Sequence, residues 1–214
     1  MKLKLLPIIT VIALIATISL AQAVATSINL LQVTWNHDPV TVYIKLQKGV
    51  DPTYKNEVIT ALNNWSNGLK SRTSSTAFNF EILDDPQSKK RPADITITLK
   101  KNTGVILGST SISSQGGLIQ QAKITLATQN ALGLPLDSAD VRNIARHEIG
   151  HALGLGHAND DGKEPIDLMA PQYDFIEVGT DTYPSELDFN ALIFIYGNDG
   201  FGGNNTKLIP PTYP

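Results

Sequence analysis

The chain has 214 residues, of which 42% are hydrophobic and 17% are charged, and this composition supplies enough apolar side chains for one globular core. Its 17 basic and 20 acidic residues give a formal net charge of −3, and such mild acidity argues against nucleic acid as a partner. The absence of cysteine excludes disulfides, thiolate metal ligands and catalytic thiols, which leaves histidine and carboxylate chemistry.

The N-terminal segment has the pattern of a secretion signal. Two lysines precede an apolar run over residues 5–20, and Ala21-Gln22-Ala23 supplies the small-x-small pattern of a signal-peptidase site. We predict that residues 1–23 are cleaved and that the protein is secreted to the extracellular space. The alternative is an uncleaved membrane anchor, although the apolar run is short for a span of about 20 residues and contains Pro7.

The first part of the predicted domain combines strands with one helix. Three segments alternate apolar and polar positions and are rich in β-branched and aromatic side chains, which predicts strands over residues 40–46, 78–83 and 93–100. Residues 54–69 instead place apolar side chains three and four positions apart. This spacing predicts an amphipathic helix, in which Trp65 belongs to the core.

A hairpin is predicted next. Residues 104–113 and 118–128 are extended in character, and the turn-forming sequence of residues 114–117 separates them. Asp137 then offers an N-cap for a helix whose apolar periodicity continues to Gly154.

The last predicted helix begins with a capping-box pattern, because Ser185 is followed three residues later by Asp188. This helix ends at Gly197. Residues 198–214 are rich in glycine, asparagine and proline and show no periodicity. We predict that they form a tail or a linker.

The sequence HEIGHALGLGH, residues 147–157, carries the chemistry. On a helix, His147 and His151 lie one turn apart on the same face, so both imidazoles can reach one ion. Gly154 can adopt the positive φ that ends a helix, which lets the chain turn back and bring His157 to the same ion. Three neutral imidazoles leave one tetrahedral position open for water, which is the arrangement of a catalytic zinc.

Glu148 adjoins the first predicted ligand, and its carboxylate can lie beside the open position. Zinc lowers the pKa of a bound water to about 7, and we expect Glu148 to accept the proton of that water and to pass it to the leaving amine. The predicted reaction is peptide-bond hydrolysis through a zinc-bound water, without an acyl-enzyme.

The motif H-E-x-x-H-x-x-G-x-x-H resembles the signature of the metzincin metallopeptidases. Those enzymes also have a Met-turn, in which a methionine forms an apolar floor beneath the zinc, and Met169 in Asp167-Leu168-Met169-Ala170-Pro171 is similar to it. The Met-x-Pro-x-Tyr pattern resembles the matrixin branch. In that branch the proline and tyrosine form the wall of the pocket for the residue after the scissile bond, a role that the resemblance assigns to Pro171 and Tyr173.

The resemblance covers most of residues 33–197 and implies a matrixin-like catalytic domain over residues 24–197. The implied fold is α+β: a twisted, mixed and mostly parallel five-stranded sheet with two packed helices, a Met-turn and a C-terminal helix. A peptide substrate would lie extended along the edge strand near residues 107–110. The resemblance also implies that Asp188 braces the Met-turn.

The chain departs from the matrixin pattern in ways that limit its metal content. The region around the predicted edge strand lacks the histidines of the family's structural zinc, so we expect a single catalytic Zn²⁺. Asp160, Asp161 and Asp167 could supply oxygen ligands to Ca²⁺, but no EF-hand pattern supports this interpretation. Latency through a propeptide cysteine is excluded because the chain contains no cysteine.

The predicted function is that of a secreted, monomeric zinc endopeptidase that acts on peptides or proteins. It would contact a membrane only if the N-terminal segment is not cleaved. One alternative is a catalytically silent binding or cell-surface protein on a metzincin scaffold. Such proteins usually lack the glutamate or one of the metal ligands, whereas this chain has Glu148 and all three histidines. The other alternative is a zinc site that hydrolyses a substrate other than a peptide.

Overall fold

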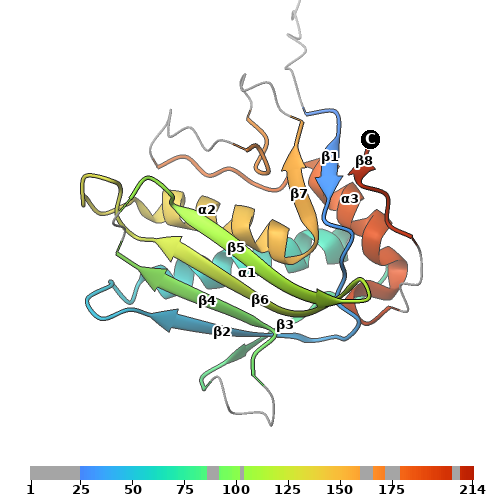
Figure 1. Ribbon diagram of the computed structural model, residues 1–214, viewed down its shortest axis with the longest axis horizontal. Helices are drawn as coiled ribbons and strands as arrows, with labels where there is room; N and C mark the ends of the chain where they lie inside the picture. The colour runs from blue at the N-terminus through green and yellow to red at the C-terminus, as the bar shows by residue number, and fades with distance from the viewer. Residues whose placement is uncertain (1–24, 86–91, 102–103, 160–165, 172–178, 204–207) are drawn as a thin grey trace, which may run out of the picture.

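A computed structural model of the chain describes residues 25–85, 92–101, 104–159, 166–171, 179–203 and 208–214. The predicted secretion signal lies outside these residues. Figure 1 shows a large twisted sheet with helices on one face, an α+β architecture. The elements, in chain order, are β1 (Ile28–Leu30), β2 (Val40–Leu46), α1 (Tyr54–Arg72), β3 (Phe80–Leu83), β4 (Ile95–Lys100), β5 (Gly108–Gln115), β6 (Leu118–Ala127), α2 (Ser138–Ala152), β7 (Leu155–Ala158), α3 (Glu186–Tyr196), the 3-10 helix η1 (Gly197–Gly202) and β8 (Thr212–Tyr213).

Five strands form the main sheet in the order β3-β2-β4-β6-β5. The first four are parallel, and β5 runs antiparallel to β6, so the predicted mixed and mostly parallel sheet is confirmed. The predicted hairpin corresponds to β5 and β6. Because β5 is an edge strand (Figure 1), the main-chain groups on its outer side can pair with an extended peptide.

The core lies between this sheet and the helices. In β4, Ile95, Ile97 and Leu99 are fully buried and alternate with threonines that are only partly buried, as expected for a strand covered on one face. Helices α1 and α2 cover that face (Figure 1). Trp65 of α1 is fully buried and donates from Nε1 to the carbonyl oxygen of Arg146 in α2 at 2.9 Å, so its prediction as a core residue is confirmed.

Several element boundaries differ from the predictions, and the largest differences are at the start of the edge strand and at the end of α1. The edge strand begins at Gly108 rather than at residue 104, because Val105 and Ile106 lie in a largely exposed loop before it. Helix α1 continues to Arg72, beyond the last apolar residue of its stripe. The basic side chains of its final turn interact favourably with the negative end of the helix dipole.

A second sheet, which the sequence did not predict, has the strand order β7-β1-β8. All of its pairs are antiparallel: Ile28 in β1 is opposite Ala158 in β7 on one side and Tyr213 in β8 on the other. Asn159 N also donates to the carbonyl oxygen of Ser27 at 2.7 Å. The short strand that follows α2 is therefore held in place by a segment from the N-terminal part of the domain.

The segment predicted as a tail, residues 198–214, packs on the domain where the structure describes it. Phe201 of η1 is fully buried, and its ring centroid lies 5.2 Å from those of both Phe78 and Tyr196. Strand β8 pairs with β1. The domain boundary at residue 197 stays a prediction.

The helix before that segment, α3, begins as predicted. Ser185 and Asp188 form a reciprocal capping box, in which the Ser185 side chain accepts from Asp188 N and the Asp188 carboxylate accepts from Ser185 N at 2.8 Å. None of the helices within the described ranges combines the length and the apolar character needed to cross a bilayer.

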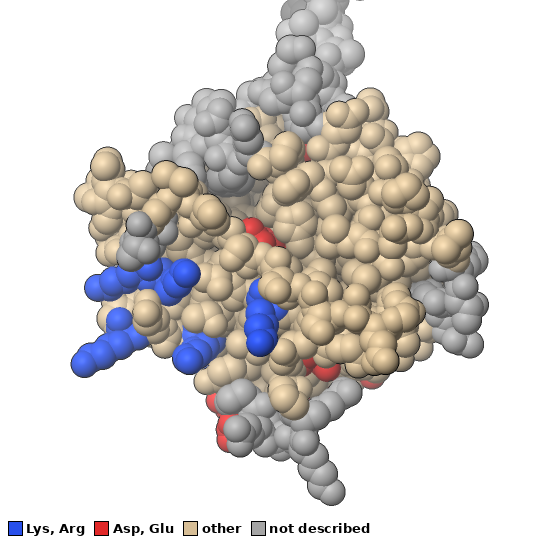
Figure 2. Space-filling model, viewed as in Figure 1, with Lys and Arg blue, Asp and Glu red and all other residues tan. Residues whose placement is uncertain are grey.

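Positive charge gathers on the face of the main sheet that the helices leave open. Figure 2 shows lysine and arginine side chains grouped over this part of the sheet. Lys45 of β2 is in register with Thr98 of β4, and Lys123 of β6 with Thr96, so these lysines lie on the same outer face. The exposed lysines of this region are Lys45, Lys48, Lys100, Lys101 and Lys123. A chain that is acidic overall thus has a cationic surface on the outer face of the main sheet.

Candidate metal centre and its cleft

Helix α2 carries the first two predicted metal ligands. The Asp137 side chain accepts from Ala139 N at 2.8 Å and so caps the helix as predicted. The helix ends before Gly154, whose φ of 104° lies in the region that favours glycine. A side-chain carbon at Gly154 would also lie 2.6 Å from the carbonyl oxygen of Val33, so both the backbone conformation and the lack of space require glycine at this turn.

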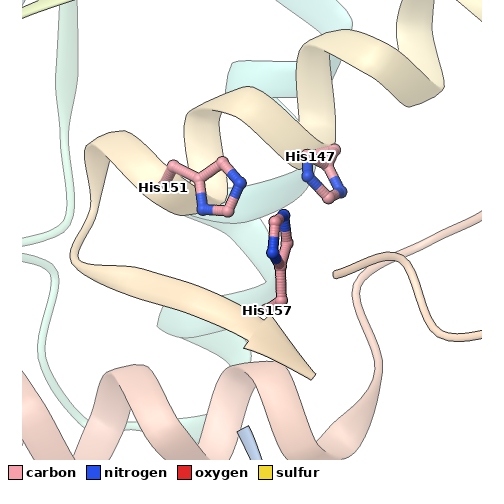
Figure 3. A group of neighbouring side chains, drawn as sticks. All are labelled: His147, His151 and His157. Atoms are coloured by element: carbon pink, nitrogen blue, oxygen red, sulfur yellow. The ribbon is translucent and has the colours of Figure 1, made fainter. Parts of the chain in front are cut away.

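After the turn at Gly154, β7 runs back and brings His157 to face His147 and His151. Figure 3 shows the three rings pointing toward one another, two from α2 and one from β7. The ring centroids are 4.6 Å apart for His147 and His151, 4.9 Å for His151 and His157, and 5.4 Å for His147 and His157. One nitrogen from each ring lies within 4.8 Å of the other two, so the three side chains could hold one metal ion.

Hydrogen bonds to the main chain orient the two helical histidines. His147 Nδ1 lies 2.7 Å from the carbonyl oxygen of Leu168, and His151 Nδ1 lies 2.8 Å from that of Leu155. A carbonyl oxygen can only accept, so each Nδ1 carries the proton and each Nε2 keeps a lone pair for a metal. This donor set fits a zinc ion.

Burial keeps the three histidines neutral. It lowers the pKa of His147 to about 4, with a further contribution from His151, and it also lowers the pKa values of His151 and His157. A neutral imidazole is the form that binds metal, so no ring has to lose a proton near neutral pH.

Glu148 of α2 follows His147 in the sequence, and its side chain lies between this helix and β5, with only 6% of its surface exposed. Its Oε2 accepts a hydrogen bond of 2.6 Å from the Thr110 hydroxyl. Burial raises the pKa of Glu148 to about 7, although the bond from Thr110 acts in the opposite direction. A carboxyl group with such a pKa can accept and release a proton near neutral pH.

The predicted Met-turn lies directly against the histidine cluster. Met169 is fully buried, and a side-chain carbon at Gly150 of α2 would come within 2.6 Å of its Sδ, so the methionine packs on the helix between the two histidines. Met169 O accepts from Ala158 N at 2.9 Å, and Leu168 O accepts from His147. The turn therefore contacts both the helix and the strand that carry the predicted ligands.

A pair of buried carboxyl groups joins the Met-turn to α3. Asp167 Oδ1 accepts from Met169 N at 2.8 Å, and the Asp167 side chain hydrogen-bonds that of Asp188, which is fully buried in α3. Burial, and then the charge of Asp167, raises the pKa of Asp188. The raised pKa favours a protonated carboxyl group in this pair, and the contact joins α3 to the Met-turn.

The raised pKa makes stability depend on pH. The folded state retains a proton that an unfolded aspartate loses above its ordinary pKa of 3.8, so the contribution of the pair to folding falls as pH rises toward the raised pKa. Asp167→Asn should therefore gain stability relative to the parent between about pH 5 and pH 8. Urea unfolding of metal-free protein would measure this difference. Exposed Asp84→Asn is the control, and a stability difference between the parent and Asp167→Asn that stays constant with pH would contradict the assignment.

Arg146, the residue before His147, is a fully buried arginine, which its sequence pattern did not predict. Its Nη1 donates to Asp181 Oδ1 at 2.8 Å and to Asn143 Oδ1 at 2.7 Å, and its guanidinium lies 4.3 Å from the centroid of the Tyr183 ring. Arg142, one turn earlier on α2, also binds Asp181 through two nitrogens. Two arginines therefore fix the segment before α3 to α2, the helix that carries His147 and His151.

A cleft of about 460 Å³ opens beside the three histidines. Its lining combines the edge strand, helix α2 and the Met-turn, and Pro171 belongs to it, whereas Tyr173 lies outside the described residues. The lining residues are Val105, Leu107, Gly108, Ser109, Thr110, Ile144, His147, Glu148, His151, His157, Ala170 and Pro171. Asp160 and Asp161, considered for calcium, also lie outside the described residues. His37 is outside the histidine cluster and pairs with Asp94 at 2.9 Å.

Comparison with known proteins gives a consistent result. A family model described as matrixin, of peptidase family M10, matches residues 34–197. Human matrix metalloproteinase-16 is 28% identical over 199 residues, which is 84% of this chain and 29% of that protein. Human matrix metalloproteinase-27 is 40% identical over 72 residues, and Xenopus laevis matrix metalloproteinase-18 is 35% identical over 71, each covering 33% of this chain. The chain thus spans less than a third of the length of these relatives.

Proposed function

Because this chain belongs to the matrixin family of metallopeptidases, we propose that it hydrolyses peptide bonds with one zinc ion held by His147, His151 and His157. The observation that carries the proposal is the convergence of three imidazole nitrogens in a cleft that also contains a buried glutamate and an edge strand. We further propose that the protein is secreted, acts as a monomer and takes peptides or proteins as substrates.

Each part of the cleft has a role in this proposal. The edge strand β5 pairs with the main chain of an extended substrate near residues 107–110. When bound, zinc supplies a Lewis acid that polarises the scissile carbonyl and makes water a stronger acid. Glu148 accepts the proton of the attacking water at a carboxylate oxygen and then delivers it to the leaving amine nitrogen. Met169 forms the apolar floor, and Pro171 forms the wall of the pocket after the scissile bond, a role that the resemblance also assigns to Tyr173.

Zinc removal tests the proposal. Full-length protein treated with a chelator should lose all cleavage of a mixed peptide library, and a single equivalent of Zn²⁺ should restore it. His151→Ala should bind zinc at least tenfold more weakly than the parent and cleave nothing under the same conditions. The control is His37→Ala, which changes a histidine outside the metal centre and should retain both properties.

The outcomes separate the alternatives. Cleavage that survives complete removal of metal would overturn the zinc mechanism. A parent protein that binds zinc and cleaves no peptide would support the catalytically silent scaffold, or a zinc hydrolase with another kind of substrate.

A further inference from the structure

We infer that the edge strand β5 forms a seat for the Glu148 carboxylate, in which Thr110 binds one oxygen and Gly108 makes room for the other. This inference rests on the proposed function, because it gives Thr110 a positioning role for the proposed base. It goes beyond the role of β5 in pairing with a peptide, since it assigns two of the strand's own residues to the hydrolytic machinery.

The first observation is the bond from Thr110. Its hydroxyl lies 2.6 Å from Glu148 Oε2 and 3.0 Å from the Glu148 carbonyl oxygen. A hydroxyl has one proton to donate, and the shorter contact, to a group that can be ionised, is the stronger of the two. The bond fixes the rotation of the carboxyl group about its last torsion angle, which is otherwise broad.

The second observation is the absence of a side chain at Gly108. A carbon atom built there would collide with Glu148 Oε1 and would come within 2.8 Å of both Glu148 Cγ and Ile144 Cγ2. Gly108 and Thr110 are two residues apart on β5, so they face the same side of the strand, toward α2. The two residues therefore enclose the carboxyl group from one face of one strand.

This arrangement gives the two carboxylate oxygens of Glu148 different roles. Oε2 accepts the bond from the Thr110 hydroxyl, and we assign to Oε1 the exchange of a proton with water and with the leaving amine. A glutamate in a helix has three rotatable bonds, and burial alone does not select one orientation of its carboxyl group. The seat holds the base in one orientation before substrate arrives, which is the preorganisation that catalysis requires.

Thr110→Val and Thr110→Ser, made in the full chain, test the inference. Valine keeps the shape and removes the hydroxyl, so kcat for a peptide that the parent cleaves should fall about 10- to 100-fold, with KM and zinc stoichiometry little changed. Serine restores the donor and should recover kcat to within about threefold of the parent. Ser111→Ala, on the opposite face of β5, is the matched control. Equal losses for valine and serine, or no loss for valine, would overturn the inference.

A stability cycle tests the seat without any activity. If the hydroxyl binds the carboxylate, Thr110→Val should lower the melting temperature in the parent background and should do so much less in a Glu148→Ala background. Equal shifts in the two backgrounds would show that Thr110 and the Glu148 side chain do not interact energetically, and this result would overturn the inference. If the parent cleaves no peptide while the cycle shows coupling, the proposed function fails and the seat remains as a structural contact.

Discussion

Replacing Glu148 with glutamine is expected to lower kcat for peptide hydrolysis by about 10²–10⁴-fold while one zinc ion remains bound. Glutamine has nearly the same shape, and its amide oxygen can still accept the bond from Thr110, but it cannot take a proton from water. Since the residue is 6% exposed and points into the cleft, the change removes a proton acceptor from the site without opening the fold.

The measurement compares parent and Glu148→Gln on one peptide substrate, with zinc content determined for both proteins. Glu57→Gln is a suitable control, because Glu57 pairs with Arg142 on the other side of α2 and does not line the cleft. Equal rates for the parent and Glu148→Gln would mean that another group is the base or that a contaminating enzyme does the cleaving. Loss of zinc together with activity would mean that Glu148 supports the metal centre rather than the proton transfer.

The second large effect concerns stability. Asp181→Ala should lower the free energy of unfolding by about 3 kcal/mol, because it removes the carboxylate that pairs with buried Arg146. Arg146 is 1% exposed, and its other partners among the described residues are uncharged oxygens, so its charge would stay buried without a counterion. Asp181 is itself 31% exposed, which places the expected loss at the lower end for a broken buried ion pair.

An exposed ion pair of the same chemistry serves as the comparison. Arg72 pairs with Glu186, whose side chain is 71% exposed, and Glu186→Ala should cost less than about 1 kcal/mol. Urea unfolding of both variants in the presence of zinc would give the two values. A loss for Asp181→Ala as small as that for Glu186→Ala would show that Arg146 needs no carboxylate partner.

The parts of the structure that the sequence predicted are those determined locally. The apolar stripe around Trp65, the caps at Asp137 and Ser185, and the turn at Gly154 each depend on residues within a few positions of one another. The three histidines share one short segment, so a helix and one turn bring them together. Periodicity and capping chemistry are sufficient to predict such features.

The parts that it did not predict depend on distant pairings. Strands β1 and β8 are too short for a periodic pattern, and only their register with β7 and with each other makes them strands. Thr110 lies in a polar strand with no motif, and its role follows only from the packing of β5 on α2. Arg146 has the sequence character of a solvent-facing helical residue, and it is buried because Asp181 and Tyr183 cover it.

The sheet that holds β7 also has a bearing on the order of folding. Ile28 pairs with Ala158, although all five strands of the main sheet and the helices α1 and α2 lie between these two residues in the sequence. Closing so long a loop is entropically costly, so contacts within the main sheet and helices should form before β1 reaches β7. The two helical histidines can then be in place while the strand carrying His157 still lacks its neighbours. We therefore expect His157 to reach its final position after His147 and His151, once β1 has paired with β7.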